Sequence, residues 1–338
     1  MTALPSPSLL AEVQGPLDAA GFAAIRAAAR PVVLRGQVAD WPAVAAARAG
    51  DAALVDYLTR ERSARPVQAI AAAPSEGGRF FYTPDLTRLN FVRGSGRFET
   101  FLDDLMGAAA LADPPAMAVQ SEDLPSLLPA FVRDNRLALL PEVAAKVWIG
   151  NRIRVGTHYD AKENVACCVA GQRCFTLYPP NQIANLYPGP FELTPAGIPV
   201  SMVDPAAPDL DQYPRFAEAA RHAASGTLEP GDAIYIPYGW WHAVDSLAPV
   251  SMLVNYWWTP GQPTGIGGPY EGLLHALLAF RHLPSEQRAV WRGIVDYYVF
   301  ESAGDPAAHL PPHAKGVIGP ASPEMFAQIR AILRQSLG

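Results

Sequence analysis

Short strand-like segments follow one another closely between residues 147 and 258, and they constrain the fold more than any other feature. Each is β-branched or aromatic and is bounded by Gly, Pro or Asn. They are VWIGNRIRVGTHYD, NVACCVAG, RCFTLYPP, DAIYIP, WHAVDSL and PVSMLVNYWW. The chain also has 34 prolines in 338 residues, and proline interrupts helix interiors. Consecutive short strands without intervening helices predict an antiparallel barrel or sandwich.

The segments on either side of this region have a different pattern. Residues 1–146 alternate helices with strands, and residues 261–338 are helical. The expected helices are 16–29, 51–63 with Asp51 as N-cap, 98–110, 271–282, 285–301 and one that begins at Ser322-Pro323. The expected strands outside the core are 31–36, 66–72 and 79–83. We therefore expect a mainly β fold with flanking helices: an N-terminal α/β portion (1–146) that packs on the barrel, a catalytic core (147–260) and a C-terminal helical region (261–338).

One insertion interrupts the core strands. Residues 187–214 carry seven prolines and show no helical or strand periodicity. A loop of this length inside a compact domain is usually functional, and proline lowers the entropy cost of ordering it. We expect an ordered lid that overhangs the barrel mouth and shapes substrate access.

Composition excludes several classes of protein. Hydrophobic residues make up 50% and charged residues 17%, which excludes disorder, and no apolar run is long enough for a membrane span. The net charge of −6 argues against nucleic acid as a partner. The cysteines form no disulfide framework, since there are three within eight positions: Cys167, Cys168 and Cys174. With no secretory signal at the N-terminus, we expect a soluble protein of the cytoplasm.

Two segments carry the chemistry, GTHYDAKEN (156–164) and EPGDAIYIPYGWWHAV (229–244). His158 and Asp160 are two residues apart at the end of a strand, so their side chains share one face. In the second segment a Pro-Tyr-Gly turn brings His242 onto the next strand. Two histidines and one aspartate form the facial triad of non-haem Fe(II) sites. An isolated His-x-Asp is a weak signal and His242 alone could be a core histidine, but the strand and turn context favours a metal site.

The motifs resemble a known family. The spacing of Gly231, Pro237, Gly239 and His242 resembles the second metal-binding motif of cupins. Residues 147–258 resemble the JmjC and cupin-like (cupin_8) branch of 2-oxoglutarate oxygenases, through HYD, Asn164, GQRCFTLYPP, NLYPGP, GDAIYIPYGWWH and VNYWW. RPVVLRGQVADWP (30–42) also matches the family's entry segment. Within the family the motifs look most like those of the asparaginyl hydroxylase that acts on hypoxia-inducible factor.

This resemblance implies a double-stranded β-helix of the jelly-roll type with Fe(II) on His158, Asp160 and His242. It also implies 2-oxoglutarate as co-substrate and O2 as oxidant. Asn164 and Asn255 would line the co-substrate pocket. Arg173 occupies the position of the family's lysine for the distal carboxylate of 2-oxoglutarate, and its planar fork suits that task.

The sequence departs from the family at two hydroxyl positions. Val155 replaces a threonine, and Ala118 replaces a tyrosine. Two hydroxyl contacts to the co-substrate are therefore missing from their usual places. Thr157, Thr176 or Tyr178 are the candidates to replace them, and Thr157 is included in the expected co-substrate site.

The expected activity is that of an Fe(II)- and 2-oxoglutarate-dependent dioxygenase that hydroxylates a protein or peptide side chain. A small-molecule hydroxylase of the same class is the first alternative. A cupin dioxygenase that needs no 2-oxoglutarate would usually have an HxH pair with further Glu and His ligands, which HYD lacks. A non-catalytic binding module is the remaining alternative.

We also expect a homodimer. The last helix carries an apolar stripe from Met325 to Leu337, and an exposed stripe of this length favours association. The resemblance implies the same, because protein hydroxylases of this family often dimerise through C-terminal helices.

Overall fold

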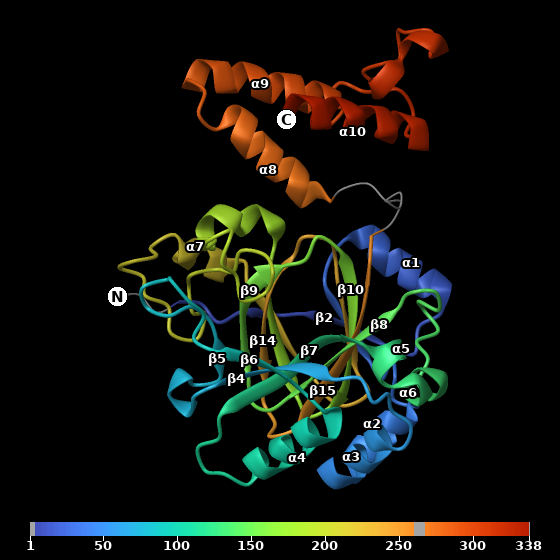
Figure 1. Cartoon of the computed structure of the whole chain (residues 1–338), viewed down its shortest axis with the longest axis vertical. Coiled ribbons are helices and arrows are strands. Elements are labelled where there is room, and N and C mark those ends of the chain that lie inside the picture. Colours follow the sequence, from blue (N-terminus) through green and yellow to red (C-terminus); the bar gives the residue numbers. More distant parts are fainter. Residues whose placement is uncertain (1–3, 260–267, 338) are drawn as a thin grey trace. The chain divides into compact units, whose positions relative to one another are not determined.

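Two β-sheets face each other in the computed structural model, which describes residues 4–259 and 268–337 (Figure 1). The chain separates at residue 260 into two units, 1–260 and 261–338, and both sheets belong to the first. The mainly β architecture predicted from the sequence is confirmed, and each of the six predicted core segments contributes at least one strand.

The smaller sheet has six strands. In spatial order they are β1 (Ser8–Leu9), β12 (Ala224–Leu228), β11 (Arg173–Tyr178), β14 (Trp241–Ser246), β9 (Arg154–Tyr159) and β5 (Arg79–Phe80). The four central strands pair antiparallel, and the two short outer strands add parallel to them.

The larger sheet has nine strands. In spatial order they are β2 (Ala11–Gln14), β3 (Val32–Arg35), β13 (Ala233–Ile236), β10 (Glu163–Ala170), β15 (Ser251–Trp258), β8 (Ala145–Gly150), β7 (Ala116–Asp123), β4 (Val67–Ala72) and β6 (Val92–Gly96). Strands from the N-terminal portion thus continue the sheet of the core on both sides of β13, β10, β15 and β8. Of these N-terminal strands, β2, β6 and β7 were not predicted from the sequence.

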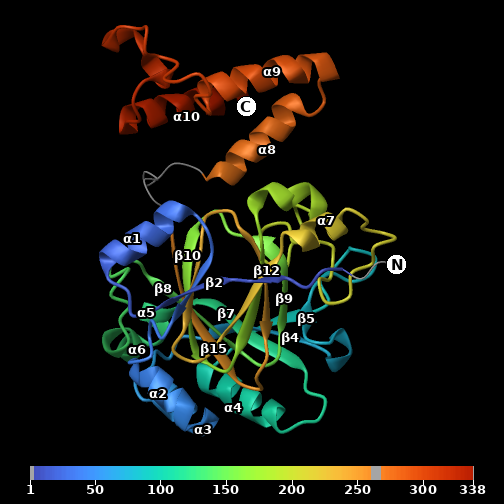
Figure 2. The same cartoon turned by 180° about the vertical axis from the view of Figure 1, so that it is seen from behind.

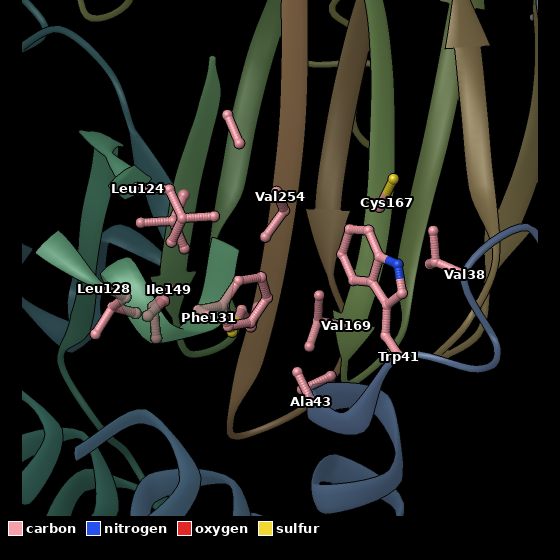
Figure 3. Close-up of a cluster of buried hydrophobic side chains, with 14 of the residues drawn as sticks. Val38, Trp41, Ala43, Leu124, Leu128, Phe131, Ile149, Cys167, Val169 and Val254 are labelled. Atoms are coloured by element: carbon pink, nitrogen blue, oxygen red, sulfur yellow. The ribbon is translucent and has the colours of Figure 1, made fainter. Parts of the chain in front are cut away.

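The position of strand β10 between two apolar clusters explains why its sequence is apolar without interruption. Ala166 and Cys168 face the smaller sheet, where they pack with Phe175 and Val244. The alternate residues of β10 face the helices on the other side of the sheet. Figure 3 shows part of that second cluster, with Val254 and Val169 near Trp41 and Phe131. Because both faces of the strand are buried, its sequence is a continuous apolar run rather than an alternating one.

Seven α-helices and two 3₁₀ helices accompany the sheets in the described part of the first unit. The α-helices are α1 (Ala19–Ala28), α2 (Pro42–Ala49), α3 (Asp51–Thr59), α4 (Phe98–Ala109), α5 (Leu124–Leu127), α6 (Pro129–Asp134) and α7 (Phe216–Arg221). The 3₁₀ helices are Pro74–Glu76 and Pro180–Asn185. Both views place α2, α3 and α4 at one end of the unit and α7 at the opposite end (Figures 1 and 2).

Two local predictions need correction. Asp51 is the first residue of α3 and not its N-cap; Gly50 is the cap, with φ 128°. Helix α2 was not among the expected helices, because proline usually interrupts a helix. Proline is also favoured in the first turn of a helix, where its missing N–H has no partner to lose, and Pro42 begins α2 in this way.

The second unit contains α8 (Pro269–Phe280), α9 (Ser285–Tyr298) and α10 (Pro323–Leu337), with 3₁₀ turns at Pro312–Ala314 and Gly316–Ile318. The three predicted helices are confirmed. The hydroxyl of Ser322 accepts a hydrogen bond of 3.1 Å from the Met325 N–H, as expected for an N-cap. Among the helices that the structure describes, none has both the length and the apolar character needed to cross a membrane.

Candidate metal centre and cavity

Three side chains from the two predicted segments meet between the sheets. His158 on β9 is paired directly with His242 on β14, and the centroids of their rings are 4.3 Å apart. Asp160 follows the end of β9, and its Oδ2 is 3.8 Å from His242 Nε2. One ligand atom from each of the three residues lies within 4.8 Å of the other two. The turn before β14 contributes to this arrangement, since Gly239 (φ 74°) donates its N–H to the Asp160 carbonyl at 3.0 Å.

A β-bulge in β9 sets the direction of the neighbouring side chains. His242 pairs with His158 and Val244 with Val155, so β9 has one residue more than β14 between these pairs. A bulge of this kind changes which face the following residues point to. Val155 and His158 consequently both line the same cavity, whereas Thr157 does not.

The hydrogen bonds of the two histidines leave the same ring nitrogen available. His158 Nδ1 lies 2.9 Å from the Gly156 carbonyl, and His242 Nδ1 lies 3.1 Å from the Trp240 carbonyl. Because a carbonyl can only accept, Nδ1 carries the proton in each ring and Nε2 holds a free lone pair. Burial, together with the adjacent His158, lowers the pKa of His242 to about 4, which keeps this imidazole neutral.

The carboxylate of Asp160 completes a donor set that fits a divalent metal. Its Oδ2 is buried and has no hydrogen-bond partner among the described residues. A buried carboxylate oxygen without a donor is costly, unless a cation binds it. Two imidazoles and one carboxylate on one face match the ligands preferred by non-haem Fe(II).

The triad borders a cavity of about 350 Å³ between the two sheets. The smaller sheet contributes residues of β9, β11 and β14, and the larger sheet contributes residues of β8, β10 and β15. Pro195, Ala196, Gly197 and Val200 of the 187–214 insertion also line it. The insertion is attached to β9 by a hydrogen bond of 2.7 Å from the Ser201 N–H to the Thr157 carbonyl.

Arg173 lies in the same cavity as a buried cation. Arg173 is 3% exposed, and its Nε donates a hydrogen bond of 2.9 Å to the Ser251 hydroxyl. Over residues 4–259 and 268–337 no carboxylate forms an ion pair with it. Burial accordingly lowers the pKa of Arg173 to about 10. An arginine buried without a counterion is suited to binding an anion.

Two amides and two indoles line the cavity on the larger sheet. Asn164 Oδ1 is buried without a hydrogen-bond partner in the described part of the chain. Asn255 Oδ1 accepts a hydrogen bond of 2.9 Å from Trp148 Nε1. Trp257 stands edge-on to Trp148, with ring centroids 5.8 Å apart, and its Nε1 also lacks a partner within the described residues. The cavity thus offers further polar atoms for a ligand.

The hydroxyl candidates from the sequence do not line this cavity. The Thr157 hydroxyl is buried on the other side of β9. Thr176 and Tyr178 alternate with the inward residues of β11: the Thr176 hydroxyl lies 3.4 Å from Ser225, and Tyr178 packs against Phe216. Ala118 is buried in a separate apolar cluster.

Sequence reasoning missed several lining residues. Arg93 reaches the cavity from β6, and Ser121 reaches it from a bulge in β7, where Ser121 has φ 56°. Trp148 and Trp257 also line the cavity and were not among the expected site residues. The unusual backbone of Ser121 leaves no sequence signal, because serine, unlike glycine, does not indicate positive φ.

Two facing sheets with a His-x-Asp and His cluster between them define the cupin class of β-sandwich proteins. The chain belongs to the Cupin-like domain family, whose profile matches residues 18–263.

Several curated proteins are similar to parts of the chain. It is 27% identical over 264 residues to the human bifunctional peptidase and (3S)-lysyl hydroxylase JMJD7, which covers 68% of this chain and 77% of that protein. It is 38% identical over 105 residues to lysine-specific demethylase JMJ31 of Arabidopsis thaliana, covering 31% of this chain and 19% of JMJ31. Human HSPB1-associated protein 1 is 35% identical over 115 residues, covering 33% of this chain and 22% of that protein. The matches to JMJ31 and HSPB1-associated protein 1 thus span about a fifth of those relatives.

Proposed function

We propose that this protein is an Fe(II)- and 2-oxoglutarate-dependent dioxygenase that hydroxylates a protein or peptide side chain. The observation that carries the proposal is one cavity that contains both a metal-binding triad and an arginine buried without a counterion. The named activities of two relatives, a lysyl hydroxylase and a lysine-specific demethylase, support the same class of chemistry and a protein substrate.

The metal would bind to Nε2 of His158 and His242 and to the Asp160 carboxylate. Three protein ligands would hold the metal and would leave it able to bind small ligands as well. Fe(II) with 2-oxoglutarate and O2 supplies the oxidising chemistry that converts a C–H bond to C–OH, with succinate and CO2 as co-products. The backbone carbonyls of Gly156 and Trp240 fix the orientation of both imidazoles.

The co-substrate would bind with one carboxylate on Arg173. A guanidinium can hold a carboxylate through two parallel hydrogen bonds, and the Ser251 hydroxyl fixes the direction of Nε. Asn164 and Asn255, which border the same cavity, would provide further polar contacts. Thr157 was part of the expected site, but its position behind β9 does not support a contact. Phe175, Val244 and Leu253 form an apolar wall that limits access of water.

Substituting Asp160 with alanine tests this proposal. The variant loses the one anionic ligand of the triad, so we expect metal affinity to fall by more than about a hundredfold and succinate formation to stop. Metal binding is measured by calorimetry, and succinate is measured with a panel of peptides and metabolites. Asp211→Ala, at an exposed aspartate outside the cavity, is the matched control. Normal iron affinity in Asp160→Ala would contradict the triad.

We also propose that the protein forms a homodimer through its C-terminal helices. Within the second unit, α8 and α9 expose several large apolar side chains, among them Leu274, Leu278, Val290 and Trp291. An exposed apolar face of this kind favours association, and twofold dimers are the commonest closed assembly.

The three free cysteines support a reducing compartment, and we propose the cytoplasm.

A further inference from the structure

Arg93 reaches the cavity from the edge of the larger sheet. Its strand, β6, pairs with β4 alone, and all five residues of β6 are exposed. An exposed side chain that also lines a cavity lies where the cavity opens to solvent. Arg93 is therefore positioned to meet whatever enters the site.

The charges of the cavity leave Arg93 without a counterion. Among the described residues of the lining, three side chains besides the two histidines are charged: Asp160, Arg173 and Arg93. Under the function proposed above, on which this inference rests, Asp160 binds the metal and Arg173 binds the co-substrate. The Cζ atom of Arg93 lies 5.3 Å from the centroid of the Phe91 ring. Across the described residues no carboxylate forms an ion pair with Arg93.

A second cation lies beside the lining. Lys162 is exposed, and its ammonium is 5.5 Å from the ring centroid of Trp257, which lines the cavity. No ion pair of Lys162 occurs within residues 4–259 and 268–337. A cationic substrate would therefore meet two positive charges, and the one carboxylate in the lining, Asp160, would be bound to the metal.

We propose that the substrate is an acidic peptide and that Arg93 binds one of its carboxylates at the opening of the cavity. The guanidinium has donors for a bidentate contact and no competing partner. The positive charges of Arg93, at the opening, and of Lys162, beside the lining residue Trp257, favour an anion over a cation as the ligand. This substrate class differs from the lysine side chains named for JMJD7 and JMJ31.

The test uses three pools of labelled synthetic peptides that are identical except for two fixed residues beside the centre. These residues are acidic in the first pool, neutral in the second and basic in the third. Binding to protein loaded with Mn(II) and 2-oxoglutarate is followed by fluorescence anisotropy, and succinate is measured in parallel with Fe(II). Loss of one charge-assisted hydrogen bond corresponds to about tenfold or more in affinity. We therefore expect the acidic pool to bind at least about tenfold more tightly than the basic pool.

Reversing the charge of Arg93 tests whether this residue binds the peptide directly or only adds to the overall charge of the surface. Arg93→Glu should invert the preference, so that the basic pool binds better. Arg97→Glu makes the same change of charge four residues later, outside the cavity lining, and should keep the acidic preference. An equal preference in wild type and Arg93→Glu would overturn the inference and assign Arg93 the role of an edge-strand charge that prevents unwanted pairing.

Failure of the inference and failure of the proposed function give different results. Succinate formation that depends on Fe(II), without any preference between the pools, rejects the acidic substrate and keeps the dioxygenase. An acidic preference that depends on Arg93, without any succinate formation or 2-oxoglutarate binding, rejects the dioxygenase and retains the acidic-peptide site.

Discussion

Substituting Arg173 with methionine removes the guanidinium and keeps much of the apolar stem. The change affects stability and ligand binding in opposite ways. In the free protein burial lowers the pKa of Arg173 from its ordinary value to about 10. The folded-state pKa lies below that of the unfolded chain, so the unfolded chain binds this proton more tightly. Below pH 10 the charge therefore costs about 3 kcal/mol of folding stability.

Removing the charge should therefore raise the folding stability, but the loss of a hydrogen bond partly offsets this gain. The variant loses the hydrogen bond to Ser251, and it leaves that fully buried hydroxyl without its partner. Leaving a buried polar group unsatisfied costs about 1–3 kcal/mol. The difference predicts that ligand-free Arg173→Met is as stable as wild type, or up to about 2 kcal/mol more stable.

The effect on 2-oxoglutarate binding should be larger and of opposite sign. Loss of a charge-assisted pair costs about 2 kcal/mol, which raises the Kd about thirtyfold. At a concentration of about 100 times the wild-type Kd, the ligand stabilises wild type by about 2.7 kcal/mol. The same concentration should stabilise the variant by about 1 kcal/mol.

Urea unfolding with Mn(II), with and without 2-oxoglutarate, measures both quantities. Arg30→Met, at an exposed arginine outside the cavity, should keep the full ligand-dependent stabilisation. Arg173 would have a purely structural role if the ligand-free variant lost more than about 2 kcal/mol and the ligand still stabilised it fully. That result would refute the reasoning and move the carboxylate site elsewhere.

Three further predictions concern other parts of the chain. Limited proteolysis should cut slowly within residues 187–214, because Val200 and Ser201 are buried and Ser201 is bonded to β9; rapid cleavage, with or without ligands, would contradict an ordered lid. Deletion of residues 320–338 should convert a dimer to a monomer in light scattering, and an unchanged mass, or a monomeric full-length protein at micromolar concentration, would disprove the proposed interface. Cys168, whose pKa burial raises to about 12, should not react with a thiol reagent at pH 8 until the protein unfolds; fast labelling of the folded chain would show that β10 opens.

Much of the candidate metal site could be predicted from local sequence. A His-x-Asp pair at a strand end and a Pro-Tyr-Gly turn before His242 are short-range features, because period 2 and turn chemistry act over a few residues. The structure brings these three side chains together as the pattern indicated. The segment NVACCVAG likewise predicted a strand, β10, and the structure adds that both faces of this strand are buried.

Alternation from His158 already predicts that its neighbour Thr157 points to the opposite face, so Thr157 should not have been included in the expected site. The position of Val155, on the same cavity as His158, has a different physical cause. Strict alternation would put Val155 and Thr157 on one face and His158 on the other. The bulge in β9 depends on the pairing with β14, a strand more than eighty residues away, and it brings Val155 and His158 to the same cavity. Such a two-against-one pairing is a property of two strands together, and the sequence of either strand alone does not contain it.

The sequence by itself determined which strands form the core, the turn that precedes His242 and the residue types of the triad. Only the tertiary structure decided what else shares the cavity. Arg93 comes from an edge strand, and Pro195 to Gly197 come from the long insertion. These positions depend on the packing of two sheets, because contacts between distant segments form only when the strands that carry them are placed side by side. For the same reason Arg173 became recognisable as a cation without a counterion only when its surroundings were known.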